Sequence, residues 1–170
     1  MSETKTSKVF ISEEMINNDL KDRILSLSDK YLSDYHINFS DGNIYLDLKL
    51  RVKSIGDLSV KYLLKVLNFT FNENEHSLKV AYLEDVKSEG NPVQKIMLKA
   101  LSLKNGTFLQ TAVGMANLQG ITAEEKNCSI DIEQLVNLKG SFLSILSLQY
   151  LDSRDGALQL SFSIIPENKF

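Results

Sequence analysis

The chain has 170 residues, 43% of them hydrophobic, and a net charge of −3 at neutral pH. A single domain of this length can bury roughly 70% of its extended-chain surface, and only two prolines and eight glycines occur, so a disordered or low-complexity chain is excluded. The 19 basic residues are outnumbered by 22 acidic ones, which excludes the positive field that nucleic-acid binding requires.

The N-terminal residues 1–9 are polar and are expected to be flexible. Beyond Ser12, Glu13 and Glu14 fall in a first helical turn, where they favour the helix dipole. Apolar residues then recur at steps of three or four, namely Ile16, Leu20, Ile24, Leu27 and Tyr31. The spacing predicts a long amphipathic helix of about six turns.

The period changes to two in the next segment. Residues 44–52 alternate strictly between apolar and polar, which predicts a strand with one inward and one charged outward face. A second strand is expected over residues 58–71, with a change of phase at Leu67 that predicts a β-bulge and a sharp bend. A third strand is expected from Leu78 to about Asp85.

Two helices are expected between two sets of strands. Pro92 suits the first turn of a helix, and the apolar side of this helix carries Val93, Ile96, Met97, Ala100 and Leu101. A second helical stretch begins near Thr107. These segments predict an inserted helical pair.

Two stretches with Asp-Gly between alternating runs predict hairpins, at Asp41-Gly42 and at Asp155-Gly156. Further strands are expected over residues 128–133, 146–150 and 158–164. The fold class predicted from these elements is α+β, with a strongly bent antiparallel sheet wrapped on a long N-terminal helix and an inserted helical pair. No linker divides the chain, so residues 10–170 are expected to form one domain.

The sequence gives no support for catalysis or for a cofactor. His36 and His76 are the only histidines, and neither has a partner at metal-ligand spacing, so no metal site is expected. Asp41 and Asp155 are better explained as turn residues than as paired acids. Cys128 is the only cysteine, which excludes an intramolecular disulfide and favours a buried thiol. The chain is therefore predicted not to be an enzyme.

The order of elements resembles that of single-domain bacterial members of the tubular lipid-binding superfamily. The resemblance is carried by residues 37–44, by residues 129–135, by Leu146-Ser147-Leu148 and by residues 155–158, and it covers roughly residues 10–165. In that superfamily a curved antiparallel sheet wraps around a long helix, and an apolar seam between them accepts acyl chains.

The resemblance implies non-catalytic binding of a lipid or another long apolar ligand in a groove between helix and curved sheet. The expected apolar lining consists of Ile44, Leu46, Leu48, Leu50, Leu64, Phe69, Met97, Phe108, Leu158, Leu160 and Phe162. The alternative is a protein interaction or assembly module with the same fold and a filled core, which would act through a sheet edge or a homodimer interface.

No segment of the chain has the length of a secretory signal or of a membrane span. A soluble, cytoplasmic protein is expected from the chain as it stands, without a transmembrane segment. A leader removed ahead of this sequence would instead indicate a secreted or envelope-associated protein.

Overall fold

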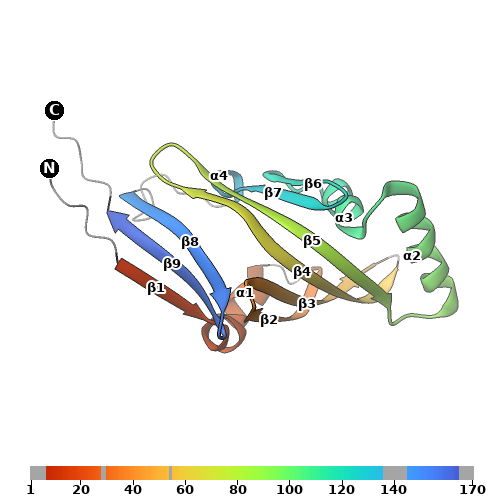
Figure 1. Ribbon diagram of the computed structural model, residues 1–170. Helices are drawn as coiled ribbons and strands as arrows, with labels where there is room; N and C mark the ends of the chain where they lie inside the picture. Colours follow the sequence, from red (N-terminus) through yellow and green to blue (C-terminus); the bar gives the residue numbers. More distant parts are fainter. Residues whose placement is uncertain (1–6, 28–29, 54, 136–144, 165–170) are drawn as a thin grey trace, which may run out of the picture.

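The computed structural model describes residues 7–27, 30–53, 55–135 and 145–164, without the side chains of Leu27, residues 101–105 and Ala116. Strands dominate it (Figure 1). The elements are β1 (Ser7–Ser12), η1, a π-helix (Met15–Asp19), α1 (Lys21–Leu27), β2 (Leu32–Ser40), β3 (Asn43–Val52), β4 (Gly56–Phe71), β5 (His76–Ser88), α2 (Pro92–Asn105), α3 (Phe108–Ala116), β6 (Ile121–Ala123), β7 (Asn127–Asp131), α4 (Ile132–Leu135), β8 (Leu146–Arg154) and β9 (Ala157–Ile164).

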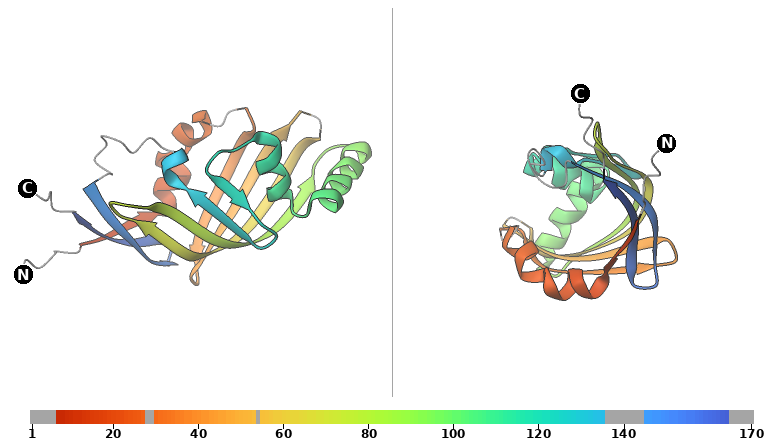
Figure 2. Two further views of the ribbon diagram at one scale, coloured as in Figure 1. Left: turned by 90° about the horizontal axis from the view of Figure 1, so that it is seen from above. Right: turned by 90° about the vertical axis from the view of Figure 1, so that its left-hand side faces the viewer.

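The nine strands form one antiparallel sheet in two parts. One part has the order β2-β3-β4-β5-β7-β6, and the other has the order β1-β9-β8. The parts join where Phe71 at the end of β4 pairs with Leu148 of β8. Seen along its length, the sheet curves into a half-pipe with α1 near one lip and α3 near the other (Figure 2).

The predicted fold class is wrong in its central element, because the described residues 7–27 and 30–40 contain no long helix. Residues 7–12, of which 7–9 were expected to be flexible, form β1 and pair with β9. The helical segment is broken into η1 and the seven-residue α1, and Leu32–Ser40 is drawn into the sheet beside β3. Hydrogen bonds between Asn17 and Ile37 hold η1 against β2, and burial of Tyr35 and Phe39 keeps β2 in the sheet, so the segment expected as one helix is divided ahead of β2.

The π-helix η1 carries a side chain that takes the place of a neighbouring strand. Asn17 accepts a hydrogen bond from the backbone N–H of Ile37 and donates one to its carbonyl, both at 2.8 Å. Glu13 accepts from the N–H of Phe39 two residues further along β2. These bonds satisfy the outer edge of β2, which would otherwise offer unpaired groups to another chain.

Both predicted Asp-Gly hairpins are confirmed. In each turn the Asp and the Gly have positive φ, 54° and 75° at Asp41 and Gly42 and 53° and 73° at Asp155 and Gly156, as a type I′ turn requires. The turns also bond to each other's strands: the N–H of Gly42 donates to Ser153, and the N–H of Gly156 donates to Phe39. The two hairpins therefore meet at one junction, and Ser153 there is fully buried.

The predicted bulge and the predicted helical pair are also confirmed. The pairing of β4 with β5 shifts between Val66 and Asn68, so Leu67 is the extra residue and is exposed. Helices α2 and α3 each begin with a capping box, Asn91 with Gln94 and Thr107 with Gln110.

Candidate functional site

The inner face of the half-pipe is apolar over β3 and β4, as the alternating pattern predicts. Cross-strand partners in an antiparallel sheet point to the same face. Leu48 pairs with Val60, and Leu50 pairs with Leu58. Val60 and Leu58 are 0% and 1% exposed, whereas their partners on β3 are only half-buried. The solvent accessibility of the inward side chains therefore rises from β4 to β3, although β3 is not an edge strand.

Helix α3 covers the β4–β5 side of this face. Phe108 and the buried Leu98 of α2 share one cluster with Val60, Tyr82 and Cys128. Burial raises the pKa of the Cys128 thiol, so this thiol stays protonated.

Glu84 is an acid on the inner face, opposite Tyr62, and it is used to hold α3. Its carboxylate accepts hydrogen bonds from the N–H groups of Phe108 (2.5 Å) and Leu109 (3.1 Å). A negative charge is favourable at the N-terminus of a helix, where N–H groups lack partners within the helix. The acid is therefore satisfied by the helix rather than free for chemistry.

Two tyrosines lie beside Glu84 and remain protonated. Their rings meet edge to face at 6.2 Å between centroids. Burial raises the pKa of both Tyr62 and Tyr82, and the hydroxyl of Tyr82 contacts Thr107 Oγ1 at 2.6 Å and donates to the carbonyl of Glu124. Tyr82, a neutral phenol with its hydrogen bonds made, is therefore a structural group and not a general base.

The predicted lining residues do not form one continuous set. Those packed on the first cluster are Leu46, Leu48, Leu50, Leu64 and Phe108. Phe69 and Phe162 pack instead on a second cluster around Phe71 and Leu146. The others on inward strand positions are Ile44, Leu158 and Leu160.

Met97 is the lining prediction that the structure does not support. Its side chain lies on the solvent-facing side of α2 and is exposed, because this helix buries Leu98 instead. Residues that sequence reasoning left out of the site are Leu58, Val60, Tyr62 and Tyr82. The same alternation that selected Leu64 places Leu58, Val60 and Tyr62 on its face, so that signal was available for these three.

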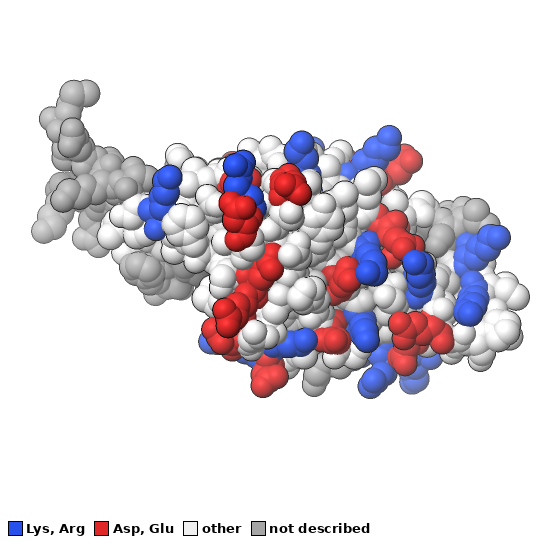
Figure 3. Space-filling view, turned by 60° about the horizontal axis from the view of Figure 1, so that its bottom comes forward, with Lys and Arg blue, Asp and Glu red and all other residues white. Residues whose placement is uncertain are grey.

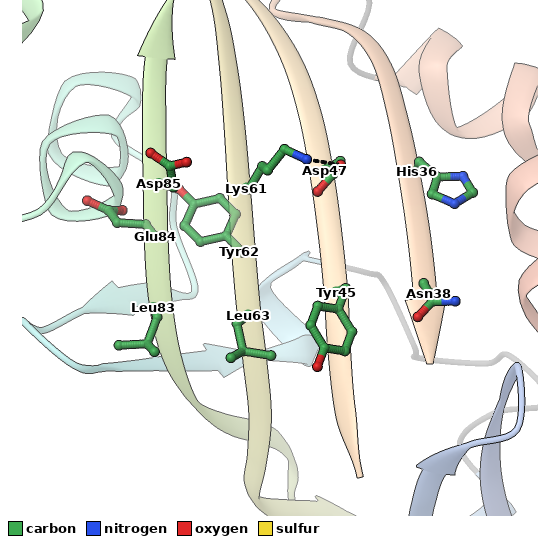
Figure 4. Close-up of a pocket in the computed structure, with 10 residues that line it drawn as sticks. All are labelled: His36, Asn38, Tyr45, Asp47, Lys61, Tyr62, Leu63, Leu83, Glu84 and Asp85. Atoms are coloured by element: carbon green, nitrogen blue, oxygen red, sulfur yellow. Dashed lines mark ion pairs between the residues drawn. The ribbon is translucent and has the colours of Figure 1, made fainter. Parts of the chain in front are cut away.

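A shallow cavity of about 430 Å³ lies on the opposite, outer face of the sheet. Figure 4 shows two rows of side chains crossing β5, β4, β3 and β2 there. One row runs Leu83, Leu63, Tyr45 and Asn38, and the next runs Asp85, Lys61, Asp47 and His36, with Lys61 and Asp47 paired at 3.0 Å. Leu83 is 67% exposed. The surface offers contact area but presents no nucleophile beside a base.

A second, more polar cavity of about 630 Å³ contains His76 and Glu133. Nδ1 of His76 lies 2.8 Å from Oε1 of Glu133, which is 57 positions away in the chain. Nε2 is buried and has no partner among the described residues, and the ring meets Phe71 edge-on. A carboxylate partner of His76 was not foreseen, since the sequence gives no local signal for a contact of such range.

No group of three metal-ligating side chains occurs within the described ranges. In the same part of the chain, no helix is long and apolar enough to cross a membrane. Comparisons with protein-family models, with curated proteins and with solved structures give no match.

Proposed function

We propose that the protein binds an elongated apolar molecule, such as an acyl chain, along the inner face of β3. The proposal is carried by the exposure gradient described above: Leu48 and Leu50 of a central strand stay partly accessible while Val60 and Leu58 opposite them on β4 are fully covered. Side chains of a protein core normally pack without such gaps. Partly accessible leucines on a concave surface are therefore available to a ligand.

The shape of the face suits a chain-like ligand. The inward positions from Ile44 to Leu50 extend over about 20 Å at the rise of an antiparallel strand. Contacts with leucine side chains are non-directional, and each buried methylene contributes about 0.8 kcal/mol. We expect affinity to rise about fourfold for each added methylene until the face is filled, with little dependence on the headgroup.

The absence of tryptophan from the sequence allows a direct test. Leu48→Trp places a single fluorophore on the inner face, and Lys49→Trp places the same fluorophore on the outer face one residue away. Titration with a fatty acid brominated on its chain should quench Leu48→Trp saturably and leave Lys49→Trp nearly unchanged. Equal quenching of both variants, or quenching of neither, would refute binding on this face.

The alternative, a protein interaction module, is supported by the row of Leu83, Leu63 and Tyr45 on the outer face, in which Leu83 and Tyr45 are exposed and Leu63 is half-buried, because exposed apolar side chains that lie together mark interaction surfaces. Under this alternative Leu83→Ser should lower self-association or partner binding measured by light scattering, while Leu48→Trp should not respond to fatty acid.

A further inference from the structure

Helix α2 turns its apolar side toward solvent. Val93, Ile96 and Met97 recur at helical spacing and therefore form one stripe. Val93 and Ile96 are 64% and 69% exposed, and Leu98 on the other side of the helix is 7% exposed. Of this stripe only Met97 was expected in the apolar lining, and the exposure of the stripe leaves an unpartnered apolar surface on a helix whose opposite side already packs Leu98 into the inner cluster.

The same helix is basic in an acidic protein. Residues 92–105 include Lys95, Lys99 and Lys104 and no acidic residue, whereas the whole chain has a net charge of −3. Lys95 and Lys99 are exposed. At the right-hand end of Figure 3, where α2 lies, blue side chains border uncharged surface. Positive charge beside an apolar stripe complements a surface that is anionic outside and apolar beneath.

The position of α2 connects this surface to the inner face. The helix projects at one end of the half-pipe (Figure 1), and its buried Leu98 belongs to the inner cluster that contains Leu58 and Phe108. The capping box at Asn91 fixes its start. A surface that contacts the stripe is therefore one helix diameter away from the apolar inner face.

We propose that α2 docks on an anionic lipid bilayer, with Val93, Ile96 and Met97 immersed at the interface and Lys95 and Lys99 near the phosphates. The inference rests on the proposed function in one respect: the bilayer is the source or destination of the apolar ligand. A lipid surface fits better than a protein partner because α2 has no aromatic residue and no arginine, the residue types that concentrate binding energy in protein interfaces.

Vesicle flotation tests the docking. Wild-type protein should float with vesicles of equal parts phosphatidylcholine and phosphatidylglycerol and remain unbound with phosphatidylcholine alone. Ile96→Ser should lower the vesicle affinity about tenfold, and Lys95→Glu should lower it about fivefold. The matched controls Leu83→Ser and Lys65→Glu change equally exposed residues on the sheet and should leave flotation unchanged.

The Leu48→Trp reporter separates this inference from the proposed function. Ile96→Ser combined with Leu48→Trp should keep the quenching by brominated fatty acid while losing vesicle binding. Flotation that is equal for wild type and Ile96→Ser, absent in wild type, or lost equally in Leu83→Ser would overturn docking through α2. Light scattering that shows a dimer dissociated by Ile96→Ser, without dependence on anionic lipid, would overturn it in favour of a second copy of the chain.

Discussion

Helices α2 and α3 follow one another in the chain and begin with the same kind of capping box, yet the apolar stripe of α2 is exposed whereas the first turn of α3 is buried. Thr107 and Asn91 each accept a hydrogen bond from the third residue of their helix. Helix α3 then buries Phe108 against the sheet, whereas α2 exposes Ile96. The comparison shows that local sequence sets where a helix begins, while the direction of its apolar face depends on what lies next to it.

The largest difference between the two helices should appear on truncating one side chain of each. Phe108→Ala removes a buried ring from the inner cluster and should lower the free energy of unfolding by about 3–5 kcal/mol. Ile96→Ala removes an exposed side chain and should change it by less than about 0.5 kcal/mol. Urea denaturation measures both values. Similar midpoints for the two variants would mean that α3 is not anchored as described.

The next prediction concerns Glu84, the acid that holds the N-terminus of α3. Glu84→Gln keeps the size of the side chain but removes the charge that accepts from Phe108 and Leu109, and it should cost about 1–3 kcal/mol. The control is Asp85→Asn, on the outer face, where the exposed ion pair with Lys87 contributes less than about 1 kcal/mol. An equal loss in the control would show that any charge removal on β5 has this effect.

Removing the capping residues should have a smaller effect, on global stability for α3 and on local hydrogen exchange for α2. Thr107→Ala should lower global stability by about 1–2 kcal/mol, because Thr107 also contacts Tyr82 of the sheet. Asn91→Ala should accelerate hydrogen exchange in α2 alone and leave the urea midpoint nearly unchanged, because Leu98 is the one described α2 side chain in the inner cluster and we expect so lightly anchored a helix to open locally. Faster exchange spreading to α3 in Asn91→Ala would contradict independent opening.

The smallest expected signal is the labelling of the single thiol under α3. Cys128 is buried and its pKa is raised by burial, so a disulfide reagent at pH 8 should react slowly with the folded protein. Phe108→Ala should accelerate labelling of Cys128, whereas Ile96→Ala should leave the labelling rate at its wild-type value. Unfolded protein, which exposes one thiol per chain, gives the reference rate. Fast labelling of folded wild type would show that α3 does not close over Cys128.

Local signals explain the part of the fold that sequence predicted. An Asp-Gly pair selects a type I′ turn through the positive φ of two adjacent residues, and a phase change at Leu67 requires an extra residue in the strand. Both effects depend on a few neighbouring residues, so they were predicted without knowledge of the remaining structure.

The predictions fail where contacts between residues far apart in the sequence determine the structure. Residues 15–27 have helical spacing, but Asn17 bonds to Ile37 and β2 is recruited by β3, so the predicted six-turn helix is divided. Periodicity identified an apolar side on α2 and could not tell whether a partner covers it. The candidate site was likewise predicted only in part. Alternation identifies which side chains of β3 face inward, whereas the solvent accessibility of these side chains depends on packing that no local pattern encodes.

The junction of the two Asp-Gly turns has a consequence for synthesis on the ribosome. The carbonyl of Phe39 receives its hydrogen bond from Gly156, and the carbonyl of Ser153 receives its bond from Gly42. The first hairpin therefore emerges more than 100 residues before its partner exists, and contacts of such separation form slowly. A nascent chain must keep this hairpin free of wrong partners until almost the whole sequence has been translated. The hydrogen bonds of Asn17 to Ile37 join residues already synthesised and cover part of the β2 edge early, whereas the Phe39 carbonyl gains its backbone partner only once Gly156 has been made.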